Sequence, residues 1–294
     1  RHPGLAPGGQ RADARGGETV DPHNLLGIEI NPRAAAIAQL VLWIGYLQWH
    51  FRVNGAGRMP PEPILRDVRT IENRDALIEW DDKVLERGAD GKPLTRWDGE
   101  TMKVHAVTGK KVPDENARVE VWRYVNPKPA KWPKADFIVG NPPFIGNKRM
   151  RLRLGDGYVI ALRRAWATVP GNVDLVMYWW ERAGTLARKR QVRAFGFVST
   201  NSIKQITNRV IINRHRSAID PLAIVFAIPD HPWRDPETDA AVRVAFTAAT
   251  AGIGPGLLQM VVKESKGRSE SVALDLAEIK GTINADLTIG SDTS

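Results

Sequence analysis

The sequence predicts an α/β fold with a mostly parallel sheet, and two kinds of segment carry this prediction. Short runs that are apolar almost throughout, such as those at 25–30 and 136–140, have the length of buried strands. A longer segment at 173–189 places its apolar residues at helical spacing. Fully apolar strands that alternate with helices are typical of a parallel sheet covered on both faces.

The first elements follow from local sequence. The run Leu25–Ile30 is expected to be a strand. Asn31 then suits the N-cap of a helix and Pro32 its first position, so the long apolar segment that follows is expected to be helical. A second buried strand is expected at 63–68, with Asp67 at its end.

The pattern divides the chain into three parts. Residues 1–24, rich in Gly, Arg and Pro, are expected to be a flexible lead-in. Residues 25–250 form the predicted core, within which 72–134 is an insertion that carries a hairpin. Residues 251–294 are expected to be a strand-rich extension. Further strands are predicted at 193–200, 223–229, 241–249 and 257–263, the terminal ones as an antiparallel hairpin.

Composition limits the classes of function. Lys and Arg number 42 against 33 Asp and Glu, a formal net charge of +9, which suits a polyanion such as nucleic acid, although simple solubility explains it almost as well. The chain has no cysteine, which excludes disulfides and thiolate chemistry and fits a cytoplasmic protein. Its most apolar stretch, 34–49, is shorter than the roughly 20 residues that span a membrane. His231 stands without partners at metal-ligand spacing, so no metal site is predicted.

The sequence Asn141-Pro142-Pro143-Phe144 follows the predicted strand at 136–140. In open α/β sheets, ligands bind beyond the carboxyl ends of the strands. Two prolines stiffen the loop, so the Asn141 side chain and the Pro142 carbonyl have fixed directions. This pair of acceptors suits an aromatic amine, whose lone pair it would aim at an electrophilic methyl group. The alternative is a tight turn that happens to contain two prolines.

This loop resembles the catalytic motif of the amino-methyltransferases, Asn/Asp-Pro-Pro-aromatic. The segments 25–49, 132–150, 173–201 and 222–233 also resemble the large adenine-N6 DNA methyltransferases of type IIG restriction–modification proteins. The resemblance implies a class I, Rossmann-like fold that uses S-adenosyl-L-methionine and acts on a flipped adenine in double-stranded DNA. It makes Asn141, Pro142, Pro143 and Phe144 the catalytic residues, with Phe144 stacking on the base.

The same resemblance assigns binding residues. Glu29 would hold the ribose of the cofactor and Asp67 its adenine, with Asn141 beside them. Among the DNA-binding residues, Phe226 or Trp233 would support the target base. Lys148, Arg149, Arg151 and Arg153 follow the loop and would contact phosphates, although a solvated charged face is an equally good explanation.

The sequence also departs from this family. No glycine-rich cofactor loop precedes Glu29, which suggests that the first strand is missing and that the chain is truncated at both ends. A nuclease and a target-recognition domain would then lie elsewhere in the same polypeptide, and the fragment is expected to be weak or inactive. Two alternatives stay open: a methyltransferase acting on RNA or on protein glutamine, and an inactive remnant that only binds DNA.

Overall fold

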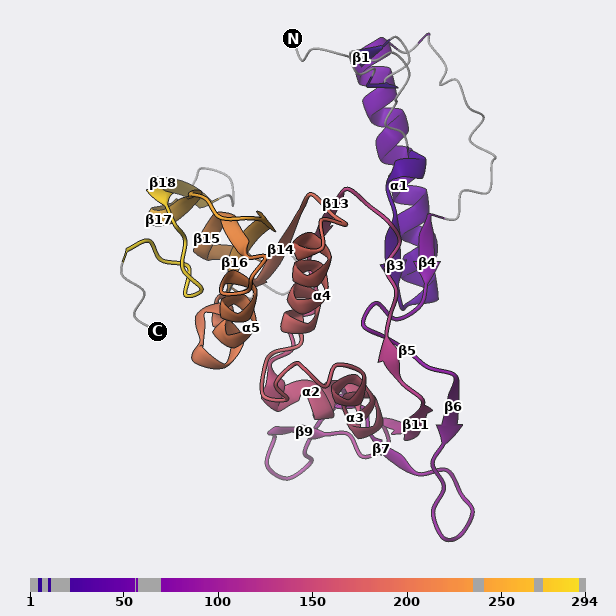
Figure 1. Ribbon diagram of the computed structural model, residues 1–294. Helices are drawn as coiled ribbons and strands as arrows, with labels where there is room; N and C mark the ends of the chain where they lie inside the picture. The colour runs from indigo at the N-terminus through magenta and orange to yellow at the C-terminus, as the bar shows by residue number, and fades with distance from the viewer. Residues whose placement is uncertain are drawn as a thin grey trace. The chain divides into compact units, whose positions relative to one another are not determined.

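The structure is a computed structural model that describes residues 5–6, 10–11, 22–55, 57, 70–234, 241–266 and 272–290 (Figure 1). The chain forms two compact units. Unit 1 comprises residues 1–76 and 130–133, and unit 2 comprises residues 77–129 and 134–294. Among the described residues, no helix is both long and apolar enough to cross a membrane.

Unit 1 is built on a strand–helix–strand arrangement. Strand β3 (Gly27–Glu29) leads into helix α1 (Pro32–Asn54), and β4 (Ile71–Asn73) pairs with β3 in parallel. The Asn31 side chain caps α1 by accepting hydrogen bonds from the amides of residues 33 and 34, at 2.9 and 3.2 Å. The predicted strand–turn–helix unit is therefore confirmed. The strand expected at 63–68, with Asp67, lies outside the described residues.

Three short elements precede β3 within unit 1, and hydrogen bonds hold the segment 130–133 that returns to this unit. Strands β1 (Leu5–Ala6) and β2 (Gln10–Arg11) pair antiparallel, and η1 (Pro22–Asn24) is one 3-10 turn. The Trp132 indole donates to the carbonyl oxygen of Ala76 at 2.7 Å. Arg74 donates to the carbonyl oxygen of Lys131 at 2.6 Å. These bonds connect residues 130–133 to the segment that follows β4.

Nested antiparallel pairs occupy the segment where the sequence predicts an insertion with a hairpin. From the base outward these pairs are β5 (Ile78–Glu79) with β12 (Lys128–Pro129), β6 (Asp82–Leu85) with β11 (Trp122–Val125), β7 (Thr95–Trp97) with β10 (Arg118–Glu120), and β8 (Met102–Val104) with β9 (Lys111–Pro113). Helix α3 (Asp156–Ala165) packs on β11. At Gly157 the two elements are so close that a Cβ would lie 1.8 Å from a carbonyl oxygen of β11.

A six-stranded sheet forms the rest of unit 2. Its strands, in spatial order, are β13 (Phe137–Gly140), β14 (Ala194–Thr200), β16 (Ala241–Ala251), β15 (Leu222–Arg234), β17 (Gly256–Lys266) and β18 (Val272–Gly281). Only β13–β14 and β15–β17 pair in parallel in this sheet. The expected mostly parallel arrangement is thus not confirmed, because β15–β16 and β17–β18 are antiparallel hairpins and β14 pairs antiparallel with β16.

The strand before the Asn141 loop is less buried than the sequence suggests. Phe137 and Val139 are 61% and 86% exposed. These two side chains lie on the same face of β13, and β13 is an edge strand that has β14 on one side only. An apolar run therefore does not by itself distinguish an edge strand from a central one.

Helices cover the sheet or follow its strands. The predicted helix at 173–189 is observed as α4 (Val176–Arg188), and its Trp180 is fully buried and donates to Thr247 of β16 at 3.2 Å. The sequence analysis did not predict α2 (Asn147–Leu154), α3 or α5 (Ile206–Arg216). A 3-10 turn, η2 (Asn201–Lys204), connects β14 to α5.

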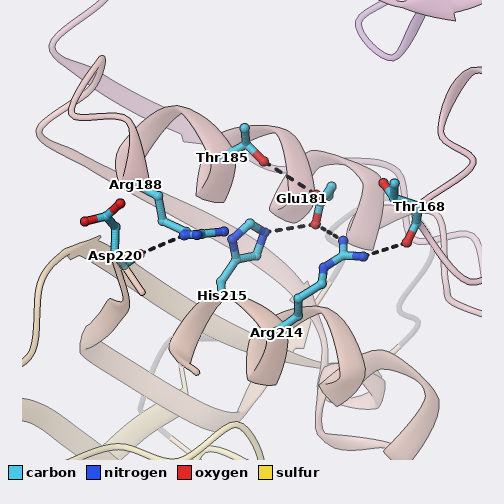
Figure 2. Close-up of polar contacts among 7 residues, drawn as sticks. All are labelled: Thr168, Glu181, Thr185, Arg188, Arg214, His215 and Asp220. Atoms are coloured by element: carbon cyan, nitrogen blue, oxygen red, sulfur yellow. Dashed lines mark hydrogen bonds and ion pairs between the residues drawn. The ribbon is translucent and has the colours of Figure 1, made fainter. Parts of the chain in front are cut away.

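A buried polar cluster joins α4 to α5 (Figure 2). Glu181 of α4 accepts hydrogen bonds from Arg214 and from the ring of His215, the latter at 2.9 Å. Glu181 and His215 are 8% and 1% exposed. Arg214 also donates to the carbonyl oxygen of Thr168, and Arg188 donates to that of Asp220, at 2.6 and 2.7 Å. The cluster holds these two helices together.

Candidate active site

The Asn141–Phe144 loop begins where β13 ends. Gly140 lies opposite Phe197 of β14, and the two strands are parallel, so Asn141 emerges at the edge of the sheet where β14 also ends. The Asn141 residue is exposed, whereas Pro142 is buried and Phe144 is 40% exposed. A buried proline next to an exposed amide and an exposed ring is the arrangement of a fixed loop that presents polar and aromatic groups outward.

Other polar and aromatic residues reach the same edge. Thr200 of β14 pairs with Val244 of β16, and Val244 pairs with His231 of β15. Because β15 runs in the same direction as β14, its final residues, including Trp233, lie at the edge where Asn141 emerges. Trp233 is 41% exposed, and its ring centroid is 6.3 Å from that of Phe246.

The two aromatic candidates for supporting a base differ in place. Phe226 lies opposite Ala248 and Leu257, in the middle of the sheet, and is half-buried. Trp233 lies near the end of β15. The sheet therefore brings Trp233, and not Phe226, to the edge that carries the Asn141 loop.

An ion-paired carboxylate lies at this edge. Burial raises the pKa of Asp230, but the hydrogen bond and charge of Arg243 outweigh it, so the pKa of Asp230 is lowered. Arg243 contacts Asp230 at 2.6 Å and Glu264 at 2.9 Å. Asn201 donates to Asp230 at 3.3 Å. A carboxylate held in its ionised form in this way is a weak proton acceptor, and the edge presents hydrogen-bonding groups rather than a strong base.

A cavity of about 370 Å³ lies beside the loop. Its lining residues are Phe144, Ile145, Arg149, Arg153, Leu154 and Glu100. Arg149 and Arg153 are one helical turn apart on α2, and Arg153 contacts Glu100 at 3.1 Å. Lys148 is exposed, and Arg151 forms an ion pair with Asp156. Of the four predicted phosphate contacts, Arg149 and Arg153 therefore line the cavity, whereas Lys148 and Arg151 are not part of its lining.

The insertion supplies one wall of this cavity, which sequence reasoning missed. Gly99 has a φ of +85°, and a Cβ there would lie 2.3 Å from the carbonyl oxygen of Leu152 on α2. Arg96 donates to the same carbonyl oxygen at 2.7 Å. This close approach places Glu100 next to Arg153. The sequence signal was a glycine in the turn Asp98-Gly99, which indicates a turn but not its partner.

In unit 1, Glu29 lies at the carboxyl end of β3. Its Oε1 accepts a hydrogen bond from the Asn31 amide at 2.8 Å. Its carbonyl oxygen accepts one from the Asn73 side chain, also at 2.8 Å. Asp67 lies outside the described residues.

The described residues contain no group of three or more His, Asp or Glu side chains that could hold a metal ion. His231 packs edge-on against Phe246, with ring centroids 5.4 Å apart. The position of this histidine is accounted for by aromatic packing.

Comparisons with known proteins identify a family whose model matches this chain and a solved structure with a similar fold. The model of the family described as MmeI, DNA-methyltransferase domain, matches residues 9–252. Among solved structures, the chain is similar to the type IIL restriction-modification enzyme MmeI in complex with DNA. The identity is 19% and the TM-score 0.58, over 94% of this chain and 30% of that chain. At this identity the likeness is one of fold, and the chain spans about a third of the length of that enzyme.

A further chain, named as a modification subunit of a type I restriction enzyme from Vibrio vulnificus YJ016, is 13% identical over 46% of this chain and 27% of that chain. Its TM-score of 0.29 is too low for a comparison of folds. A search of curated proteins finds no match.

Proposed function

Because the chain belongs to the MmeI DNA-methyltransferase domain family, we propose that it transfers a methyl group from S-adenosylmethionine to the N6 amine of an adenine flipped out of DNA. The reaction would serve a restriction–modification system. The observation that carries this proposal is the Asn141–Phe144 loop, which leaves Asn141 exposed at the carboxyl edge of the sheet and anchors it through the buried Pro142.

The loop offers two acceptors of fixed direction. The side-chain oxygen of Asn141 and the carbonyl oxygen of Pro142 would each accept one hydrogen of the adenine amine. Both bonds draw the nitrogen lone pair away from the ring and toward the incoming methyl group. The methyl–sulfur bond of the cofactor would break as the new C–N bond forms, and the amine nitrogen would then release one proton to water, so no strong base is required, in keeping with the ion-paired state of Asp230.

Phe144 and Trp233 are suited to hold the flipped base. Each is about 40% exposed, 40% for Phe144 and 41% for Trp233. Base–aromatic stacking contributes about 1–3 kcal/mol per base. A base that leaves the duplex loses its neighbours in the stack, and an exposed ring at the site compensates part of that loss.

The residues present fit the cofactor. When bound, S-adenosylmethionine supplies an electrophilic methyl group. The Glu29 carboxylate, whose Oε1 already accepts from the Asn31 amide, can accept hydrogen bonds from the two hydroxyl groups of a ribose. Its role would be to orient the cofactor rather than to take part in proton transfer.

DNA is the proposed substrate for reasons of charge and of site. The net charge is +9, and Arg149 lines the cavity next to Phe144. Phosphate contacts of this kind fix the position of the backbone beside the flipped nucleotide.

The test is methyl transfer from labelled S-adenosylmethionine by the longest natural polypeptide that contains this sequence. DNA, RNA and protein are offered in parallel, and the modified nucleoside is identified by mass spectrometry. We expect label in N6-methyladenine. Label in RNA or in protein glutamine would support the second acceptor class, and no label on any substrate would support the inactive DNA-binding remnant.

The loop itself is tested with Asn141→Ala. We expect the methylation rate to fall at least about 100-fold, because one of the two fixed acceptors is lost, with little change in DNA affinity. The matched control is Asn116→Ala, an exposed asparagine on the turn before β10, which should leave the rate unchanged. Full activity of Asn141→Ala would remove the proposed role of the loop.

A further inference from the structure

The exit of the Asn141 loop is held by the start of helix α4. The Leu175 amide donates to the carbonyl oxygen of Ile145 at 3.0 Å. The Asn147 amide, the first of helix α2, donates to the side chain of Asp174 at 2.9 Å. The loop between Phe144 and Asn147 is thus bonded twice to two consecutive residues of another element.

Asp174 replaces a cap that α2 lacks. The N-cap residue of α2 is Gly146, which has no side chain to accept from the first helical amides. A helix leaves these amides without internal partners, and a negative charge beside them is favourable. The carboxylate of Asp174, 27 residues further along the chain, provides both the acceptor and the charge.

The other oxygen of the same carboxylate accepts from two donors in the segment that follows β14. Ser202 of η2 and Asn208 of α5 donate to Oδ2, each at 2.8 Å. Asn208 is fully buried, accepts from the Asp174 amide at 2.9 Å and donates to the Ser202 carbonyl oxygen at 2.9 Å. Asp174 therefore connects the candidate catalytic loop to the segment that follows the neighbouring strand.

This connection reaches the polar groups of the sheet edge. Asn201, adjacent to Ser202, donates to Asp230. The loop after β13 and the turn after β14 are therefore held in one network. A change at Asp174 would alter the position of the loop relative to the edge without touching the groups that would contact the base.

We propose that Asp174 is a positioning residue for methyl transfer. It fixes Phe144–Asn147, and with them the Asn141 acceptors, against the turn at 201–204. The expected effect of Asp174 on the methylation rate rests on the proposed function. Its effect on the position of the loop rests on the hydrogen bonds alone.

Replacing Asp174 by asparagine removes the negative charge and one acceptor oxygen but keeps the shape of the side chain. An amide offers its oxygen to one side only, so the NH2 group must face either the Asn147 amide or the Asn208 donor. Both are donors in the native arrangement, and one bond is lost whichever way the amide turns. The side-chain volume is almost unchanged, so the core beneath has no reason to rearrange.

The experiment compares wild type, Asp174→Asn, Ser202→Ala and Asp156→Asn in the full-length natural protein. For Asp174→Asn we expect the single-turnover methylation rate to fall about 10- to 100-fold, since a misplacement near 1 Å has such an effect. The dissociation constants for DNA and for S-adenosylmethionine should change by less than about threefold. Ser202→Ala, which removes one donor of the network, should have a smaller effect. Asp156→Asn, which alters only an exposed ion pair with Arg151, should have none.

A second readout does not depend on activity. Amide hydrogen exchange followed by NMR should show faster exchange at Asn147 in Asp174→Ala, which removes both side-chain oxygens, with the amides of β14 unchanged. An unchanged rate in Asp174→Asn, unchanged exchange at Asn147 in Asp174→Ala, or a parallel loss of rate, binding and thermal stability in Asp174→Asn would overturn the inference. If wild type transfers no methyl group, the proposed function fails, while the exchange measurement still decides whether Asp174 holds the loop.

Discussion

Replacing Glu181 by glutamine tests how much a single buried charge contributes to the fold that supports the candidate site. In the cluster of Figure 2, one carboxylate oxygen accepts from both Arg214 and His215. Glutamine keeps the shape and one acceptor oxygen but removes the charge. Glu181→Leu, of similar volume, removes every acceptor and leaves both donors without this partner.

The structure sets the expected magnitudes. A hydrogen bond to a charged group contributes about 1 kcal/mol more than a neutral one, and two donors are affected. The Arg214 side chain is 36% exposed, so solvent screening reduces its share. Glu181→Gln should therefore lower the free energy of unfolding by about 1–2 kcal/mol. Glu181→Leu should lower it by about 3–5 kcal/mol, since it leaves buried donors unpaired.

The pH dependence gives the sign of the charge effect. Burial raises the pKa of Glu181, but the hydrogen bonds and charges of His215 and then Arg214 outweigh it and lower the pKa below its ordinary value of 4.5. A lowered carboxyl pKa means that the stabilisation is fully present above pH 4.5 and is lost as the pH falls through the folded-state value. The deficit of Glu181→Gln should therefore stay constant at neutral pH and shrink below pH 4.5.

Urea denaturation of wild type, Glu181→Gln and Glu181→Leu, repeated from neutral pH to about pH 4, measures both effects. Equal stability of all three proteins, or a Glu181→Gln deficit that grows as the pH falls below 4.5, would refute the reasoning.

Three further predictions concern other parts of the chain. Asn31→Ala should destabilise unit 1 by about 1 kcal/mol in urea denaturation, because the cap of α1 is lost; Asn31→Asp, which keeps the acceptor, should not. Gly99→Ala should lower the urea midpoint, because the added Cβ would clash with α2. Gly109 has a φ of +65° and nothing lies within 4 Å of the place its Cβ would take, so Gly109→Ala introduces backbone strain without a clash and should have the smaller effect. Arg149→Gln should reduce the slope of log affinity for DNA against log salt by about 0.9; the exposed, distant Lys92→Gln should leave the slope unchanged, and equal slopes would remove Arg149 from the DNA contact.

Local sequence was sufficient where neighbouring residues alone decide the outcome. Asn31 and Pro32 predicted the start of α1 because capping depends on amides within three residues. The strand before Asn141 and the stiff loop after it were predictable for the same reason. Apolar spacing located α4 to within three residues at either end.

Helix α2 was not predicted because its sequence carries no apolar period. In α2, NKRMRLRL, only Met150 is buried, so the segment resembles a charged loop. What holds α2 in place is distant in sequence: Asp174 at its first amide, and the Gly99 turn at its end. The exposure of β13 and the antiparallel order of the sheet also depend on which strands become neighbours.

The sequence by itself determined which chemical groups could form a site, since a rigid Asn-Pro-Pro-Phe loop after a strand is a property of consecutive residues. Only the tertiary structure decided which of these groups come together: Trp233 rather than Phe226 at the sheet edge, Arg149 rather than Lys148 or Arg151 in the cavity, and Glu100 beside them. The physical reason is that strand register and helix docking result from packing between segments far apart in the chain, and no pattern within one segment records its partner.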